Sequence, residues 1–207
     1  MLIPLAIRTG FRRLLEPAAL FLSRSRVSPS AITILGVIPA IAGGVAFARG
    51  SVRLGAILMG ISGLFDLADG LVARLGKKES RFGAFLDSTL DRYSEIAIFI
   101  GLAVLFRGGP GFYGVLLALA GSMMVSYTKA RAEGLGAACQ GGMLQRPERM
   151  VIVILGGLIG VRVLEWAVWV VAVLANLTAV ERLVRVGRAM RSTKSGPVKQ
   201  VPPIDEE

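Results

Sequence analysis

Four aspartates lie in an apolar part of the chain, in pairs whose spacing matches one face of a helix. Asp66 and Asp69 are three residues apart, and Asp87 and Asp91 are four residues apart. Two neighbouring helices could therefore direct all four carboxylates to one point. An unpaired carboxylate at membrane depth costs roughly 2.5–3.5 kcal/mol, and carboxylate oxygens suit hard divalent cations. The pattern predicts a bound metal or a water-filled cavity, with surface acids on solvated helices as the plainer alternative.

The rest of the chain is too apolar for an ordinary soluble domain. Of its 207 residues 54% are hydrophobic, and the mean hydropathy is +0.65. Apolar runs that span or nearly span a bilayer cover residues 32–47, 54–72, 82–106, 113–127, 150–161 and 163–180. We therefore expect an all-α integral membrane protein, with six transmembrane helices in a membrane domain over residues 28–190.

The two ends of the chain differ in composition from this membrane domain. Residues 1–27 mix Arg with Leu, Ile and Phe, which predicts an amphipathic juxtamembrane helix and no cleavable signal peptide. Residues 191–207 are rich in Lys, Ser, Pro and acids, which predicts a disordered cytoplasmic tail. Between the last two apolar runs, Arg162 and Glu165 mark the expected turn.

Basic residues predict the orientation of the bundle. Most of the 24 Lys and Arg residues lie at the termini or in the connections beside the aspartates. The opposite connections hold only Arg49, Arg53, Arg107 and Arg162. By the positive-inside rule, both termini and the acidic motif face the cytoplasm of a plasma membrane. The net charge of +10 suits anionic lipid headgroups, and the absence of a nucleic-acid reading motif argues against a nucleic-acid partner.

The composition limits the available chemistry. With a single cysteine, Cys139, and no histidine, the chain has no intrachain disulfide, no cysteine-based zinc site and no imidazole base. Catalysis must use carboxylates, hydroxyls, Lys, Arg or metal ions.

The aspartates belong to a longer string, D-x2-D-G-x2-A-R-x8-G-x3-D-x3-D, between Asp66 and Asp91. This string resembles the signature of the CDP-alcohol phosphotransferases, membrane enzymes that join the phosphatidyl group of a CDP-linked lipid to a small alcohol and release CMP. The resemblance implies two Mg²⁺ ions per active site, with Mn²⁺ as a substitute, and a homodimer. It implies that Asp66, Asp69 and Asp87 are metal ligands, and that Asp91 is the general base and a further ligand.

The resemblance also implies a binding site for the donor, CDP-diacylglycerol or CDP-archaeol. Glycine lacks a side chain, so Gly70 and Gly83 would let a nucleotide approach the backbone closely, although small residues also favour helix packing in membranes. In relatives the positions of Arg74 and Ser80 contact the CDP moiety. Upstream, Thr33 matches a second family segment, in which Ser30 replaces the Asn or Asp of many relatives. Both residues are assigned to the donor site, and Ser30 equally suits a helix N-cap.

A basic, glycine-rich segment on the same side predicts the acceptor site. The strings K-A-R-A-E-G and R-P-E-R resemble the branch of the family that uses an inositol phosphate: bacterial phosphatidylinositol phosphate synthases and archaeal archaetidylinositol phosphate synthases. The resemblance implies myo-inositol 1-phosphate as the acceptor, and several cations together could hold its phosphate. The residues assigned to this clamp are Ser126, Lys129, Arg131, Arg149 and Arg182.

Three alternatives remain at this stage. The basic residues could serve only to set the topology. The acceptor could instead be glycerol 3-phosphate, as in a phosphatidylglycerolphosphate synthase, or free inositol or serine, although a basic loop disfavours unphosphorylated acceptors. The acids could also line a divalent cation channel or transporter, but no inverted repeat is evident.

Overall fold

The computed structural model describes residue 20 and residues 28–137, 139 and 142–192. This part of the chain contains six α-helices and no strand: α2 (Pro29–Ala48), α3 (Val52–Leu75), α4 (Arg81–Leu105), α5 (Pro110–Gly134), α6 (Arg146–Ile159) and α7 (Val161–Ser192). Apart from residue 20, the predicted juxtamembrane helix lies outside the described residues. So do residues 193–207 of the predicted tail, while residues 191 and 192 continue α7.

Local sequence signals explain where these helices begin. The Ser28 hydroxyl accepts a hydrogen bond from the Ala31 amide (3.2 Å) at the start of α2, so Ser28 and not Ser30 is the N-cap. Ser80 caps α4 by accepting from the Gly83 amide at 2.9 Å. At α6, Gln145 and Glu148 form a capping box.

The break before the last helix lies at a glycine. Gly160 has a φ of 158° between α6 and α7, and this backbone conformation is accessible to glycine at little cost. Arg162 and Glu165, which we took as the markers of this turn, lie within α7 instead. The existence of the break was predicted correctly, but polar residues were the wrong signal for it.

Four of the helices are long and apolar enough to cross a bilayer: Pro29–Ala48, Val52–Leu75, Pro110–Gly134 and Val161–Arg191 within α7. Of the other two, α4 has 25 residues but carries many charged groups. Helix α6 has only 14 residues and is about 21 Å long, less than the ~30 Å hydrocarbon thickness. The chain is thus a multi-pass membrane protein, and large apolar side chains such as Ile38, Trp166 and Leu183 lie exposed on its outer surface.

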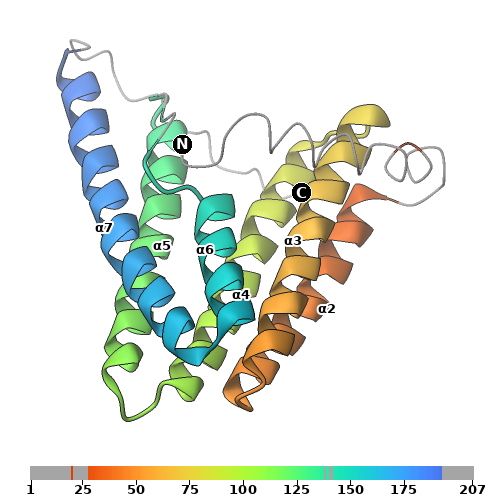
Figure 1. Cartoon of the computed structure of the whole chain (residues 1–207). Helices are drawn as coiled ribbons and strands as arrows, with labels where there is room; N and C mark the ends of the chain where they lie inside the picture. The colour runs from red at the N-terminus through yellow and green to blue at the C-terminus, as the bar shows by residue number, and fades with distance from the viewer. Residues whose placement is uncertain (1–19, 21–27, 138, 140–141, 193–207) are drawn as a thin grey trace, which may run out of the picture.

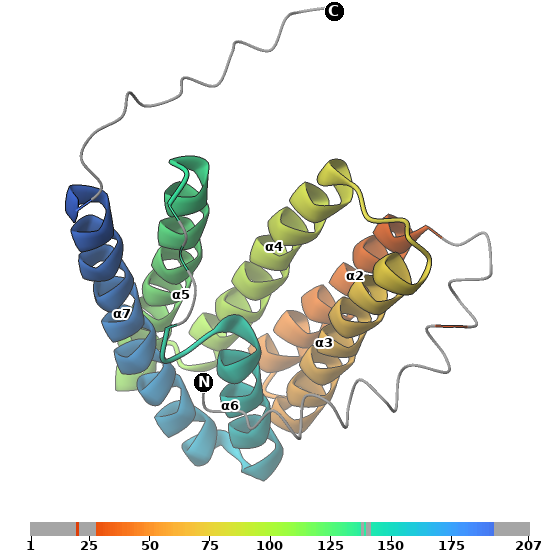
Figure 2. The same ribbon diagram turned by 90° about the horizontal axis from the view of Figure 1, so that it is seen from above.

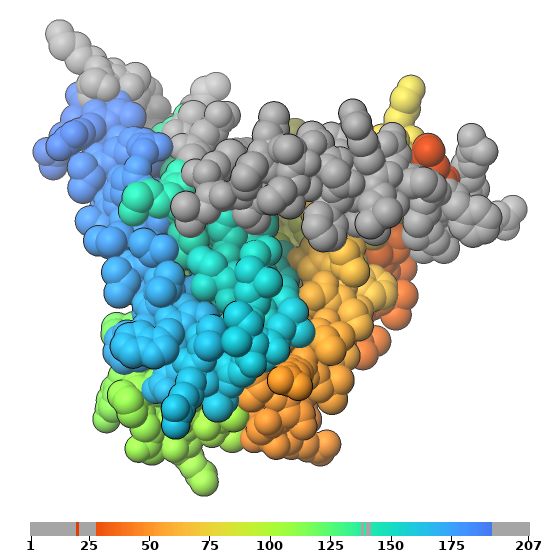
Figure 3. Space-filling view, in the orientation of Figure 1, coloured from red at the N-terminus to blue at the C-terminus, as the bar shows by residue number. Residues whose placement is uncertain are grey.

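The helices form two groups joined by a middle pair. Helix α2 packs against α3 and α4, α5 packs against α7, and α6 contacts both α3 and α7. Seen from above, α4 and α6 lie between the α2–α3 side and the α5–α7 side (Figure 2). Figure 1 shows that the two sides diverge toward the end where α3 finishes and α4 begins. The space-filling view shows the face formed by α3, α6 and α7 (Figure 3).

Small residues bring α2 and α4 into backbone contact. A Cβ atom placed on Gly101 would lie 2.0 Å from the Gly44 carbonyl oxygen, and one on Gly44 would lie 2.3 Å from the Ala97 carbonyl oxygen. Such close packing is typical of membrane helices. No hydrophobic driving force brings these helices together, and small residues instead allow close van der Waals contact between their backbones. The Ser62 hydroxyl, which donates to the Gly36 carbonyl at 2.9 Å, similarly holds α3 to α2.

Candidate active site

The two pairs of aspartates come from α3 and α4, and an arginine of α6 lies between them. Arg146 Nη1 donates to Asp66 Oδ2 at 2.5 Å and lies 2.7 Å from Asp91 Oδ1. A single guanidinium nitrogen therefore joins carboxylates of two different helices. Sequence analysis had not singled out Arg146, whose side chain is 17% exposed.

Asp69 and Asp87 complete the predicted set. Asp69 is buried, and its Oδ2 accepts a hydrogen bond of 2.6 Å from the Thr33 hydroxyl of α2. Thr33, assigned by resemblance to the donor site, thus directly contacts an expected metal ligand. Asp87 is half-buried on α4, one turn before Asp91.

The carboxylates of this site are suitable ligands for a divalent cation, but their positions do not form a complete metal site. Carboxylate oxygens are the ligands that Mg²⁺ and related ions prefer, and Arg146 demonstrates that a positive charge is stable between two of them. Among the described residues, however, no three acids already converge closely enough to hold a metal ion. The predicted convergence is therefore partial among the described residues: Asp66 and Asp91 both contact Arg146, but no three acids meet.

Charged residues continue from the aspartates along α4. Arg92 Nη2 lies 3.8 Å from Asp91 Oδ2, and Arg92 Nε lies 3.9 Å from Glu95 Oε2. Arg92 also donates to the Ser126 hydroxyl of α5. Glu95 in turn accepts from Arg149 Nη2 at 2.9 Å and from Arg149 Nε at 3.1 Å. Two residues of the predicted acceptor site, Ser126 and Arg149, are thereby connected to the aspartates.

The remaining acceptor residues lie farther along the same end of the bundle. Lys129 is exposed on α5 and pairs with Glu133 at 3.8 Å, and Arg131 is exposed on the same helix. Arg182 is buried on α7 and donates to the Val125 carbonyl at 2.6 Å. Arg149 is also buried, with its side chain 3% exposed. The structure thus presents two outer and two inner cations, not one continuous clamp.

The residues assigned to the donor lie where α2 and α4 begin and α3 ends. A Cβ atom on Gly83 would lie 2.9 Å from Ser80 Oγ and 3.9 Å from Ser30 Oγ, so these three residues form one cluster. Apart from its chain neighbours and the backbone of its own helix, Gly70 has one described neighbour within 4 Å of a Cβ atom placed there, the Arg74 guanidinium at 3.6 Å. The starts of two helices, which favour anions, therefore lie beside glycines that expose the backbone.

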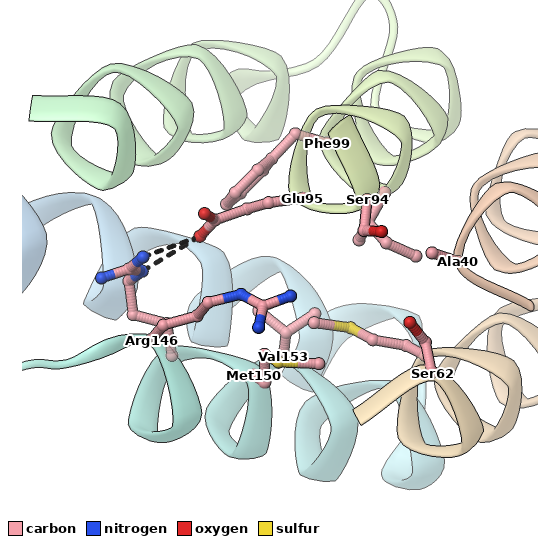
Figure 4. A pocket seen from close by; sticks show the side chains of 11 residues that line it. Ala40, Ser62, Ser94, Glu95, Phe99, Arg146, Met150 and Val153 are labelled. Carbon is pink, nitrogen blue, oxygen red and sulfur yellow. Dashed lines mark hydrogen bonds and ion pairs between the residues drawn. The ribbon is translucent and has the colours of Figure 1, made fainter. Parts of the chain in front are cut away.

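A small cavity lies deeper in the bundle than the aspartates. Its volume is about 20 Å³, and its polar lining consists of Ser62, Ser94, Glu95, Arg146 and Arg149. This volume holds one water molecule. Figure 4 shows Glu95 reaching from α4 toward α6 at its edge, with dashed lines marking its bonds to α6. Two buried atoms of the lining residues, Glu95 Oε2 and Arg146 Nε, make no hydrogen bond in the described structure.

The family described as CDP-alcohol phosphatidyltransferase matches residues 26–180 of this chain. The chain belongs to this family. As a member it is a transferase, and the matched range includes all four aspartates.

Similar proteins have more specific names. The chain is 38% identical over 188 residues to the archaetidylinositol phosphate synthase of Methanothermobacter thermautotrophicus, covering 89% of this chain and 94% of that protein. It is 42% identical over 198 residues to the phosphatidylinositol phosphate synthase of Streptomyces avermitilis, covering 87% and 81% respectively.

Solved structures of a third relative show the same fold. The Mycobacterium tuberculosis phosphatidylinositol phosphate synthase with CDP-DAG bound superposes with a TM-score of 0.77 at 36% identity, covering 84% of this chain and 94% of that one. The same enzyme in complex with manganese and citrate gives a TM-score of 0.76 at 36% identity, covering 83% and 88%. For this transferase, the likeness supports a requirement for a divalent metal.

Two charged residues beside the aspartates were missed by the sequence analysis: Glu95 and Arg146. Glu95 lies four residues after Asp91, and therefore on the same helix face, a spacing that could have revealed it. Arg146 begins the R-P-E-R string, but only the later arginine, Arg149, was assigned. Nothing in the sequence around Arg146 indicates that it contacts Asp66, which lies 80 positions earlier.

Proposed function

We propose that this transferase moves the phosphatidyl group of CDP-diacylglycerol to a hydroxyl of myo-inositol 1-phosphate, forming phosphatidylinositol phosphate and releasing CMP. The observation that carries this proposal is the direct connection between the signature aspartates and the acceptor arginine: Asp91 is linked through Arg92 and Glu95 to Arg149. The names of the similar proteins support the same acceptor. The archaeal relative favours a second donor, CDP-archaeol, with transfer of an archaetidyl group.

In the proposed reaction, the acceptor hydroxyl attacks the lipid-bearing phosphorus, and the bond from that phosphorus to the CMP oxygen breaks. Asp91 takes the proton of the attacking hydroxyl. Arg92 lies within 4 Å of Asp91, and a positive neighbour favours the charged carboxylate that a base requires. Loss of such general-base help typically costs 10²–10⁴-fold in rate.

Asp66, Asp69 and Asp87 would hold two divalent cations, Mg²⁺ or Mn²⁺. The cations would supply positive charge to the diphosphate of the donor and to the departing phosphate. The Thr33 hydroxyl orients Asp69 through its 2.6 Å hydrogen bond. Arg74 extends beside Gly70, where it would bind the CDP moiety, together with the cluster of Ser30, Ser80 and Gly83.

The acceptor phosphate would lie among the cations of α5, α6 and α7. Lys129 and Arg131 are exposed and would meet the phosphate first. Arg149 and Arg182 are buried and would contact it once it enters, with Ser126 beside them. The Glu95 carboxylate fixes the Arg149 side chain through two hydrogen bonds, so less conformational freedom is lost on binding.

In the membrane, we infer that all six helices cross the bilayer, with the aspartates and both termini on the cytoplasmic side of the plasma membrane. The bias of Lys and Arg toward that end supports this orientation. The charged half of α4 would face the polar interior of the bundle and not lipid. We further propose that the enzyme is a homodimer, as the resemblance to the family implies.

A panel of acceptors tests the proposal. Purified enzyme in nanodiscs would be given radiolabelled CDP-diacylglycerol or CDP-archaeol, Mg²⁺, and either inositol 1-phosphate, glycerol 3-phosphate, free inositol or serine. The expected result is a labelled product and stoichiometric CMP with inositol 1-phosphate only. Preference for glycerol 3-phosphate or free inositol would refute the acceptor assignment, and cation flux without CMP release would favour a channel.

A further inference from the structure

The position of Arg146 has a consequence for how the active site binds metal. Its guanidinium reaches from the first turn of α6 to Asp66 on α3 and Asp91 on α4, at 2.5 Å and 2.7 Å. Both contacts are made by the same atom, Nη1. A cation that bridges these two carboxylates must therefore take the place that Arg146 already occupies.

Electrostatics explains why an arginine is stable there. Side chains of Asp66 and Asp91 are 21% and 15% exposed, and carboxylates so poorly hydrated need a nearby positive charge. Asp69 and Asp87 lie on the same two helices, which adds further negative charge. Arg146 supplies the compensating charge when no other cation is bound.

Among the described residues, the guanidinium of Arg146 makes ion pairs with those two carboxylates only. Arg146 Nε is buried and makes no hydrogen bond in the described structure, and the same side chain borders the water-sized cavity. The guanidinium is thus fixed by two ion pairs and by no bond at Nε. A stronger cation for the same oxygens would release it without breaking any bond at that nitrogen.

We propose that Arg146 and the divalent cation are mutually exclusive partners of Asp66 and Asp91, so that Arg146 acts as an internal counter-ion that withdraws when metal binds. Arg146 would then set the metal affinity of the site by competing for its ligands. This inference rests on the proposed function to the extent that the aspartates bind divalent cations.

The exchange changes the charge around the acceptor site as well. Arg146 lies one helical turn before Arg149, so a guanidinium released from the carboxylates adds positive charge to the region assigned to the acceptor phosphate. Metal binding and phosphate binding would then favour each other, and by linkage the coupling is reciprocal. Part of that coupling should disappear when Arg146 loses its charge.

Titration with Mn²⁺ alone, followed by electron paramagnetic resonance, tests the competition without substrate. The full-length enzyme would be placed in nanodiscs of zwitterionic lipid, so that the membrane itself binds little Mn²⁺. Arg146→Gln should bind Mn²⁺ roughly tenfold or more tightly than wild type, because one charge-assisted competitor has been removed. Arg146→Lys, which keeps the charge, should lie between the two.

Thermal unfolding gives a second measurement in case the variant is less stable. Without metal, Arg146→Gln should unfold at a lower temperature than wild type, and saturating Mn²⁺ should raise its midpoint by more than it raises that of wild type. Arg107→Gln removes an exposed arginine between α4 and α5 and should change neither measurement.

The outcomes separate this inference from the proposed function. Equal or weaker Mn²⁺ binding by a folded Arg146→Gln variant would mean that Arg146 is a structural bridge that helps to shape the site, and the competition would be refuted. Failure of wild type itself to bind Mn²⁺ would refute the metal assignment and the exchange together. Tighter binding with normal acceptor selectivity would support both.

Discussion

The charged side chains of the site alternate in sign along one path, which runs through Asp66, Arg146, Asp91, Arg92, Glu95 and Arg149. Each interior member has neighbours of opposite charge on both sides. Changing one residue therefore leaves its neighbours uncompensated, and effects along the path should not be additive.

The expected metal ligands give the first prediction. Asp66→Asn and Asp87→Asn should reduce CMP release to background and weaken Mn²⁺ binding, since an amide is a poorer ligand than a carboxylate. Both variants should still fold, because a neutral amide is less costly than a charge in a bilayer. Glu165→Gln, on α7 beside Gly111 of the first turn of α5, is the control. Near-normal CMP release by either variant without added metal would contradict the metal mechanism.

The assignment of Asp91 as base leads to a second prediction. Asp91→Asn should lower kcat by roughly 10²–10⁴-fold and leave CDP-lipid affinity nearly unchanged, because a base acts in the transition state. Initial rates and equilibrium binding of the donor would be measured on the same preparation. If donor affinity falls as far as turnover, Asp91 is chiefly a ligand.

Sequence could predict the acids but not all of their partners. The four aspartates follow from fixed spacing within a short string, and spacing on one helix survives folding. The partner of Asp66 is different, because Arg146 is one of 24 basic residues and pairs with it only through the packing of α6. Likewise, Arg149 was identifiable as a basic residue of the site, whereas its burial against Glu95 depends on tertiary structure.

At the scale of helices, the α2–α4 contact aligns the proposed donor-binding residues Ser30, Ser80 and Gly83 with the aspartates. Ser30 and Thr33 lie on α2, and Gly83 and Asp87 lie on α4, so a shift between these helices would separate them. Gly44 and Gly101 permit the contact, since their backbones meet with no room for a side chain. The apolar runs predicted these two helices, but not their distance of approach.

A third prediction tests this alignment. Gly101→Ala should destabilise the bundle by about 1–3 kcal/mol and reduce turnover, because its Cβ would lie 2.0 Å from the Gly44 carbonyl oxygen. Gly60→Ala is the matched control, since the nearest described atom to its Cβ would be 3.9 Å away. Thermal unfolding and CMP release would be compared for the two. Equal unfolding midpoints and equal CMP release for the two variants would show that the close approach of α2 and α4 is unimportant.

The ion pair between α4 and α6 gives a fourth prediction. Arg149→Met should destabilise the protein by about 3–5 kcal/mol, because it leaves the Glu95 carboxylate buried without this partner. Adding Glu95→Gln should recover much of the loss. Acceptor affinity should stay low in both, since both lack the guanidinium, and the Michaelis constant for inositol phosphate should rise about 10–150-fold. Recovery of that constant in the double variant would exclude Arg149 from the acceptor site.

At the scale of the whole molecule, the connections alternate between the two ends of the bundle. Ser51 lies between α2 and α3, and Glu79 lies between α3 and α4; both are exposed. The hydrophobic runs predicted this alternation, because each apolar helix must cross the bilayer before the chain can turn. Hydrophobicity alone is a weaker signal for α6, because its 14 residues are fewer than a usual transmembrane span needs.

Labelling of intact cells tests the orientation. In a Cys139→Ser background, a membrane-impermeant maleimide should label Ser51→Cys from outside, but should label Glu79→Cys only after the membrane is permeabilised. Ser51 caps α3 without a side-chain hydrogen bond, so its replacement should cost little stability. The reverse pattern would place the aspartates outside the cell.

The bundle is closed by different forces at its two ends. Away from the aspartate end, a core including Phe47, Leu102, Val115 and Leu164 joins all six described helices by apolar contact. At the aspartate end, ion pairs connect α6 to α3 and α4. Salt screens partly hydrated ion pairs and hardly weakens apolar burial. The molecule is thus held by apolar packing at one end and by ion pairs at the other, so a change of ionic strength should loosen the aspartate end and leave the apolar core unchanged.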